Sequence, residues 1–257
     1  MTESKIGSPQ NGNLITWIAD TFRHRGIAGA LGYYTGAACE FLRDLSPQRR
    51  RSRYGDIDYD FDHGVDTSWA TVSLRTRLRE LVSGAQYQAS EPTLFAEILR
   101  ALPAPPDSFT LIDLGSGKGR TLLTASDYPF EQIIGVELLE ELHQIARTNI
   151  ARYHAQRQRC FNLVSVCGDA RAFSFPDGPL VVYLFNPFPD YVLKTVLHNL
   201  RQAAEAQARD IYVIYHNLVH EDVFRAQEWL REVHRTYEFA IYRAEIANAE
   251  KIGIDKC

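Results

Sequence analysis

Three glycines alternate with polar residues directly after a run of branched and aromatic residues. The stretch is FTLIDLGSGKGRTLLTAS, residues 109–126, with glycine at positions 115, 117 and 119. Glycine has no side chain and adopts positive φ angles freely, so a loop of this kind lets the backbone approach a bound ligand closely. The pattern predicts a nucleotide-type ligand held at the end of a buried strand.

Two phosphate-binding patterns fit this loop poorly. A P-loop requires Ser or Thr directly after its lysine, but Gly119 follows Lys118. The dinucleotide fingerprint G-x-G-x-x-G is met by Gly115 and Gly117, whereas Arg120 stands where the third glycine is required. An NAD-dependent oxidoreductase therefore stays an alternative, and Arg120 disfavours it.

Acidic residues close the next two strand-like runs. Glu137 ends QIIGVE and Asp169 follows LVSVCG. A carboxylate at the end of the second strand can accept hydrogen bonds from both hydroxyls of a ribose, in NAD enzymes as well as in others. The structural alternative for each carboxylate is a helix cap or a turn.

The loop resembles the first motif of the class I methyltransferases, acid-x-G-x-G-x-G, which Asp113 to Gly119 match at every position. The resemblance implies S-adenosylmethionine as cofactor and a seven-stranded, Rossmann-like fold. It implies these contacts with the cofactor: the loop residues Asp113, Gly115, Ser116, Gly117 and Gly119, then Glu137 with Leu138 at the ribose, and Asp169 with Ala170 at the adenine.

The end of the fourth strand carries Asn186, Pro187 and Phe188. They resemble the N-P-P-[YF] motif of methyltransferases that act on amide or exocyclic nitrogen, although here the second proline, Pro189, follows the aromatic residue. The resemblance implies that Asn186, which also borders the cofactor, and a proline carbonyl accept hydrogen bonds from the target amine. The alternative is a proline-stiffened loop with Asn as a helix cap.

His216 ends the fifth strand, four residues before His220. A base near the acceptor or a hydrogen-bonded loop histidine is the favoured interpretation of His216. Two histidines four apart can bind a metal on one helix face, but His216 falls outside the expected helix. We expect no metal site.

The segment before the first motif, YQASEPTLFAEIL, is similar to the corresponding segment of seven-strand lysine methyltransferases. The resemblance implies a loop that closes over the cofactor, with Tyr87, Glu91, Pro92 and Thr93 as lid residues. An ordinary helix start explains Pro92 equally well.

Strands and helices must alternate to bring these residues together. Runs rich in Val, Ile and Leu alternate with amphipathic segments, which predicts a doubly wound, mostly parallel sheet, with an antiparallel edge possible after residue 237. The expected strands are 109–114, 132–138, 161–170, 179–188, 210–217 and 237–246, and the expected helices are 91–102, 120–126, 140–156, 191–207 and 220–233.

An N-terminal extension, residues 1–86, precedes the methyltransferase-like domain, residues 87–257. Residues 1–13 read as a disordered tail, and residues 13–45 as one or two helices broken near Arg25-Gly26. The basic run 49–53 is best interpreted as a solvated charge run. In residues 56–62, aspartates alternate with apolar residues, which predicts an extended segment with an acidic face, either a solvated face or the lip of a cleft for a basic substrate.

Composition places few further bounds on function. The chain has 257 residues and a net charge of −4, so we expect no global field that attracts nucleic acid or an anionic membrane. A protein or small-molecule acceptor is accordingly favoured, and nucleic acid is expected to be an unlikely one. Four scattered cysteines read as reduced thiols of a cytoplasmic protein, with no membrane span expected. A cofactor-binding scaffold without catalysis stays open, as do the acceptor's identity and the oligomeric state.

Overall fold

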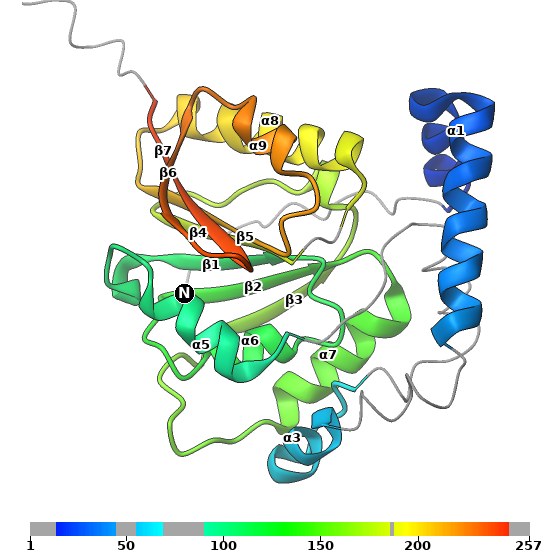
Figure 1. Ribbon diagram of the computed structural model, residues 1–257. Helices are drawn as coiled ribbons and strands as arrows, with labels where there is room; N and C mark the ends of the chain where they lie inside the picture. The colour runs from blue at the N-terminus through cyan, green and yellow to red at the C-terminus, as the bar shows by residue number, and fades with distance from the viewer. Residues whose placement is uncertain (1–13, 45–54, 69–89, 186–187, 247–257) are drawn as a thin grey trace, which may run out of the picture.

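A seven-stranded sheet forms the centre of the computed structural model, which describes residues 14–44, 55–68, 90–185 and 188–246 (Figure 1). The strand order is β3-β2-β1-β4-β5-β7-β6. The first five strands in this order are parallel, whereas β7 runs antiparallel to β5 and β6 antiparallel to β7. Their bounds are β1 Thr110–Leu114, β2 Gln132–Glu137, β3 Leu163–Cys167, β4 Leu180–Phe185, β5 Ile211–His216, β6 Leu230–Arg235 and β7 Phe239–Ala244.

Helices cover both faces of this sheet (Figure 1). One face carries α5 (Pro92–Arg100), α6 (Arg120–Ala125) and α7 (Glu140–Arg152), and the other carries α8 (Asp190–Ala206) and α9 (Glu221–Arg225). Two short 3-10 helices, η2 (Pro106–Ser108) and η3 (Ala170–Ala172), lie in the connections. Separate apolar clusters fill the two faces, because alternate residues of each strand point to opposite sides.

This arrangement confirms the predicted doubly wound, mostly parallel sheet. Every residue of β1 and β5 is buried, as the uninterrupted apolar runs predict for central strands. The chain order reverses beside β1, whose neighbours are β2 and β4. In open α/β sheets ligands bind at the carboxyl ends of the strands next to such a reversal.

The predicted helix over residues 220–233 is wrong in its second half. Helix α9 ends at Arg225, and Leu230–Arg235 forms the edge strand β6, paired with β7. The spacing of apolar residues fits a helix, but tertiary pairing with β7 prevails. Charged side chains of β6 make ion pairs along this edge, Arg231 with Glu245 and Arg235 with Glu221, and charges of this kind protect an edge strand from further pairing.

The N-terminal helix α1 spans Leu14–Asp44 and is kinked at Gly26, which has φ 67° and ψ 175°. This confirms the break expected near Arg25-Gly26. Glycine permits the positive φ angle at the kink. Beyond it, Ile27 and Leu31 keep 74% and 57% of their surface exposed.

The acidic segment is helical, so the predicted extended conformation is wrong. Helix α3 spans Gly55–His63. On this helix Tyr59 and Phe61 have different surroundings, whereas a strand would place them on one face: Tyr59 stacks on His63, and Phe61 is 87% exposed. The basic run 49–53 and the tail 1–13 lie outside the described residues, and so does the division expected between residues 86 and 87, which stays a prediction.

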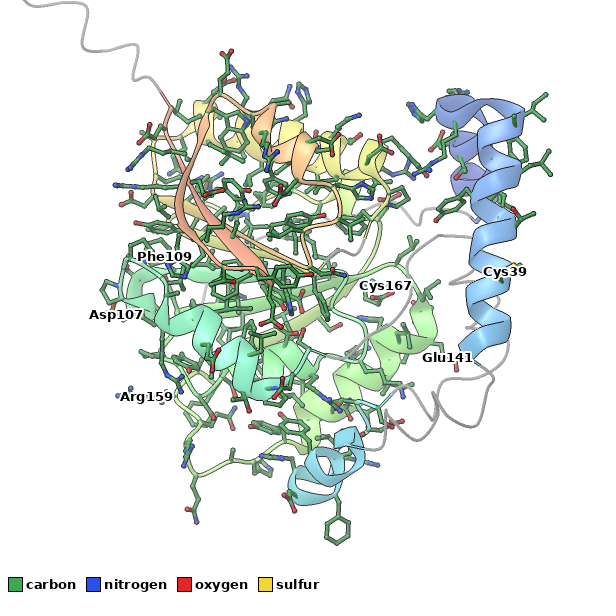
Figure 2. All side chains as sticks on the ribbon, viewed as in Figure 1. Cys39, Asp107, Phe109, Glu141, Arg159 and Cys167 are labelled. Carbon is green, nitrogen blue, oxygen red and sulfur yellow. The ribbon has the colours of Figure 1, made fainter. Side chains whose placement is uncertain are left out.

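No helix in the described part of the chain is long and apolar enough to cross a membrane. Three of the cysteines are described, and all are free thiols: Cys160, Cys39 on α1 and Cys167 at the end of β3. Figure 2 labels Cys39 and Cys167.

Candidate cofactor and acceptor site

The glycine loop connects β1 to α6 and has the backbone geometry that only glycine adopts readily. The φ angles of Gly115, Gly117 and Gly119 are +89°, +54° and +85°. The N–H groups of Gly115 and Ser116 both donate to the carbonyl of Val136, at 2.8 and 3.1 Å. These bonds fold the loop back onto the end of β2, beside the reversal point of the sheet.

Glu137 closes this loop from the end of β2. Its Oε2 accepts the N–H of Gly117 and its Oε1 accepts the N–H of Leu139, both at 2.8 Å. The side chain is buried, and burial raises its pKa, while the backbone N–H groups oppose that rise. A carboxylate accepts about four hydrogen bonds, so each oxygen retains capacity for a further donor. These two acceptor oxygens fit the two hydroxyls of a ribose, which would donate to them.

Asp113 lies inside the sheet, below the loop. Burial raises its pKa to about 8; a hydrogen bond with the Thr121 hydroxyl opposes this rise, and the charge of Glu137 reinforces it. Asp113 therefore holds a proton near neutral pH and is no free carboxylate. The resemblance places it in the cofactor motif, and the structure gives it a position that fixes the base of the loop.

Asp169 is held by its own neighbour. Its carboxylate accepts hydrogen bonds from the backbone N–H of Arg171 at 2.9 Å and from the guanidinium, whose closest contact is 2.7 Å. The helix-cap alternative is thus realised, because the backbone bond caps η3. Arg171 also pairs with Asp20 of α1 at 2.5 Å. The adenine contact expected of Asp169 and the buried Ala170 stays a prediction.

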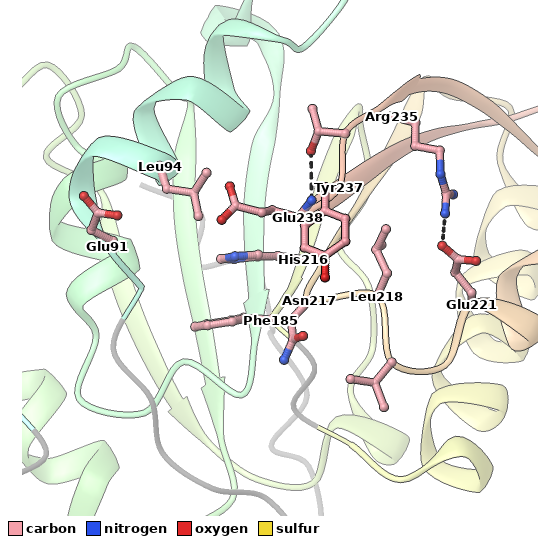
Figure 3. A pocket seen from close by; sticks show the side chains of 12 residues that line it. Glu91, Leu94, Phe185, His216, Asn217, Leu218, Glu221, Arg235, Tyr237 and Glu238 are labelled. Atoms are coloured by element: carbon pink, nitrogen blue, oxygen red, sulfur yellow. Dashed lines mark hydrogen bonds and ion pairs between the residues drawn. The ribbon is translucent and has the colours of Figure 1, made fainter. Parts of the chain in front are cut away.

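A cavity of about 810 Å³ opens beside the ends of β4 and β5 (Figure 3). Phe185 and His216 lie in its wall as parallel stacked rings, 4.1 Å apart between centroids. Glu91 at the start of α5 and Glu238 before β7 add carboxylates to the lining. Asn217 continues the wall with a positive φ of 60°, a conformation that Asn tolerates better than most residues.

His216 is 6% exposed, and burial lowers its pKa to about 4. It is therefore neutral at pH 7. A group of this pKa is a weak general base, so the geometry supports hydrogen bonding more than proton abstraction.

A buried hydrogen-bond chain links His216 to the base of the glycine loop. His216 Nδ1 lies 2.7 Å from the Tyr183 hydroxyl, which lies 3.1 Å from Ser90 Oγ. Thr121 then donates to Ser90 at 3.3 Å, and its hydroxyl also contacts Asp113. Sequence reasoning missed both Tyr183, which belongs to no motif, and Ser90, which lies in the lid-like segment but was not among its named residues.

Several expected site residues are not brought to this place. Phe188 packs on the apolar cluster beneath α8. Thr93 is exposed and lines a different cavity, with Thr124 of α6 and Arg157. Asn186, Pro187 and Tyr87 lie outside the described residues. Leu138 is half-buried at the end of β2, next to Glu137.

Sequence reasoning also missed the partners of Lys118 and Arg120. The loop lysine binds Asp66 at 2.8 Å, and Arg120 lies 3.6 Å from Asp60. Asp60 belongs to residues 56–62, the segment expected to be a solvated face or the lip of a substrate cleft, and Asp66 follows shortly after it. A lysine and an arginine next to a buried strand need acidic partners, so their positions in the sequence indicated that such partners must exist elsewhere in the chain. Among the described residues no group of three or more His, Cys, Asp or Glu is arranged to hold a metal ion.

The strand order and the glycine loop define the fold of the class I methyltransferases. Neither a protein-family model nor a curated protein matches the sequence. The chain is similar in structure to an RNA methyltransferase from Salinibacter ruber in complex with S-adenosylhomocysteine, at 18% identity and a TM-score of 0.38, over 66% of this chain and 100% of that one.

Two further solved structures show the range of proteins matched. A ribosomal protein L11 methylase from Lactobacillus delbrueckii is 14% identical, with a TM-score of 0.42, over 63% of this chain and 82% of that one. A predicted N6-adenine-specific DNA methylase from Listeria monocytogenes is 15% identical, with a TM-score of 0.45, over 63% and 53%. This chain thus spans about half the length of some of the proteins it matches.

The expectation that nucleic acid is an unlikely acceptor is wrong. By their names, the matched structures include an RNA methyltransferase, a predicted DNA methylase and the 23S rRNA methyltransferase ErmE. The expectation rested on the net charge of −4, and a net charge does not describe how charges are distributed. Three arginines, Arg100, Arg157 and Arg159, line one cavity of about 730 Å³ together with a single acidic residue, Asp127, so positive charge is concentrated locally in this acidic protein (Arg159 in Figure 2).

Proposed function

We propose that this protein is an S-adenosylmethionine-dependent methyltransferase whose cofactor binds against the glycine loop and the carboxylate of Glu137. The observation that carries the proposal is the carboxylate of Glu137, which holds the Gly117 N–H at 2.8 Å and keeps acceptor capacity at the end of β2. A ribose diol satisfies that capacity. The loop beside it allows close approach of a ligand, because three of its residues lack a side chain.

The other cofactor contacts follow from the resemblance. Glu137 would bind the ribose hydroxyls, and Leu138 would pack beside them. Ala170 would lie along the adenine, with Asp169 accepting from its amino group. When bound, the cofactor supplies an activated methyl group on a sulfonium sulfur. The chain itself supplies alignment and electrostatics.

The acceptor would enter the cavity at the ends of β4 and β5, where Asn186, Pro187 and Phe188 follow β4. Asn186 and the carbonyl of Pro187 would accept hydrogen bonds from the acceptor nitrogen, whereas Phe188 packs on the apolar cluster beneath α8. The neutral His216 would add a hydrogen bond within the same wall. Glu91 and Glu238 favour acceptor groups that donate hydrogen bonds, since a carboxylate only accepts them.

Two alternatives have distinct signatures. An NAD-dependent oxidoreductase would bind NAD in place of S-adenosylmethionine. Arg120 argues against it, because it is buried and engaged with Asp60 where that fingerprint requires glycine. A cofactor-binding scaffold would bind S-adenosylmethionine but show no turnover.

Calorimetric titration with S-adenosylmethionine, S-adenosylhomocysteine and NAD tests the cofactor. We expect wild type to bind the first two, and Glu137→Gln to bind them about 10 to 100 times more weakly, since a hydrogen bond to a charged group contributes about 1.5–3 kcal/mol. Glu131→Gln is the matched control, because Glu131 is exposed just before the other end of β2. Binding of NAD alone would contradict the proposal.

Turnover is tested with a labelled methyl group and four acceptor pools: RNA, DNA, protein and small amines. If wild type methylates one of these pools and Glu137→Gln does not, the protein is a methyltransferase and that pool contains its acceptor. Cofactor binding without transfer to any of them would favour the scaffold.

A further inference from the structure

The glycine loop and the first residue of α6, which follows it, carry two cations that are almost completely removed from solvent. Lys118 is 0% exposed and Arg120 is 2% exposed. A charge buried in this way is costly unless it is paired and hydrogen-bonded. The chain segment that binds them therefore bears directly on the conformation of the loop.

Both cations bind residues 59–68, a segment from the N-terminal part of the chain. The Lys118 ammonium donates to Asp66 Oδ1 and to the carbonyl of Ser68, each at 2.8 Å. Arg120 Nε donates to the Thr67 hydroxyl at 2.6 Å, and its guanidinium lies over the ring of Tyr59 at 5.0 Å. The segment thus contacts the loop by charge, by hydrogen bonds and by a cation–π interaction.

The segment is folded into a shape that presents these groups. Gly64, with φ 64°, turns the chain after α3. Asp60 then accepts the N–H groups of Thr67 and Ser68, at 2.9 and 2.8 Å, and also the Thr67 hydroxyl. Asp60 therefore organises the turn internally while its carboxylate faces Arg120.

Asn149 of α7 joins the segment to the backbone of the loop. Its side-chain amide donates to the carbonyl of Asp66 at 2.7 Å and to the carbonyl of Lys118 at 2.9 Å. Its oxygen accepts the N–H of Asp66 at 2.9 Å. One side chain, itself 2% exposed, thus fixes the loop backbone and the segment together.

We propose that Asp60 and Asp66 are positioning residues of the cofactor site, and that residues 59–68 must be docked on the glycine loop for the loop to bind its ligand. This inference rests on the proposed function. Lys118 lies between two glycines with positive φ, and the N–H of its neighbour Gly117 binds Glu137. Docking holds a flexible backbone in one conformation before the ligand arrives, which lowers the entropic cost of binding.

If residues 59–68 only stabilised the fold, the expected result would differ. Weakening their contacts would change the stability of the protein and leave the affinity of the folded protein for its ligand unaltered. Coupling between docking and binding is reciprocal, so a variant that weakens docking must weaken binding, and the ligand must strengthen docking.

The test compares Asp66→Asn, Lys118→Met and the double variant, with Asp62→Asn as matched control. Asp62 lies in the same helix as Asp60 and is exposed. Dissociation constants for S-adenosylhomocysteine are measured at a temperature at which each variant keeps the circular dichroism of wild type. We expect about tenfold weaker binding in each single variant, no further loss in the double variant, and no change in Asp62→Asn.

Hydrogen exchange of wild type keeps the inference testable should a variant fail to fold. We expect S-adenosylhomocysteine to slow exchange in residues 59–68 of wild type, and to slow it less in Asp66→Asn. Unchanged affinity in both single variants, or unchanged exchange in wild type with ligand bound, would overturn this inference alone. Failure of wild type to bind the ligand would overturn the proposed function and this inference with it.

Discussion

His216 is predicted to make the protein lose stability below pH 6.5. Its pKa falls from 6.5 for a free imidazole to about 4 in the folded protein, because burial disfavours the charged ring. The folded protein therefore holds the proton less tightly than the unfolded chain. Unfolding takes up a proton between these two values, so the stabilisation is fully present above pH 6.5 and is lost as the pH falls towards 4.

The size of the effect follows from the same gap. Each pKa unit corresponds to about 1.36 kcal/mol, so the free energy of unfolding should fall by about 3 kcal/mol between pH 7 and pH 4 through His216 alone. About 2 kcal/mol of that loss should already be present at pH 5. The side chain is 6% exposed, so solvent screening reduces these values little.

Urea unfolding of wild type and His216→Gln at pH 7, 6 and 5 isolates this contribution. Gln can still bond to the Tyr183 hydroxyl but does not titrate, and the carboxylates of both proteins titrate alike, so their effects cancel in the difference. We expect the stability advantage of wild type over the variant to shrink by about 2 kcal/mol between pH 7 and pH 5.

Titration of the His216 ring by NMR checks the cause directly. Glu91 and Glu238 line the same cavity, and a closer approach of either carboxylate would hold the imidazole charged. A measured pKa above 6, or wild-type and variant curves that run parallel from pH 7 to pH 5, would refute the reasoning.

Two further predictions concern the loop and the acceptor. A Cβ at Gly135 would lie 2.6 Å from Ser116 Oγ and 2.7 Å from Leu122 Cδ1, so Gly135→Ala should destabilise the protein by about 2 kcal/mol in urea unfolding. Adding Ser116→Gly should restore part of that loss, and no recovery would argue against this contact as the cause. Asn186→Ala should lower turnover about a hundredfold while S-adenosylhomocysteine binds as in wild type; full turnover would show that Asn186 has no role in transfer.

The parallel strands could be predicted from the sequence because they are buried on both faces. Residues 133–136 and 211–215 carry no charged side chain and are mostly branched or aromatic, and both lie in strands. Glu137 could be placed beside the glycine loop once these strands were predicted, since the carboxyl ends of adjacent parallel strands meet at one edge of the sheet.

Local periodicity failed where tertiary contacts decide the structure. Residues 230–235 carry a pattern that fits a helix, but pairing with β7 makes them a strand. In residues 55–63 the alternation suggests a strand, but the segment is a helix. Each of these segments is short, so its apolar residues fit either period.

Contacts between residues that are far apart in the chain could not be predicted from the sequence, for a different reason. Lys118 and Asp66 are 52 positions apart, and Tyr183 and His216 are 33 apart. No pattern in a single sequence states that such residues meet. A short separation does not suffice either: Asp169 and Arg171 are only two residues apart, but they pair because the chain turns between them.

Lys118 and Arg120 also bear on the kind of ligand that the loop can hold. In a P-loop the lysine reaches the phosphates of the ligand, whereas here the ammonium of Lys118 is fully buried and bound to Asp66 and Ser68. Arg120 is engaged with Asp60 and Thr67. Both cations are thus held by the chain itself, through contacts with residues 59–68. A phosphate that requires a lysine, as in a P-loop, would have to compete with these contacts, whereas a ribose without phosphate needs only the carboxylate of Glu137.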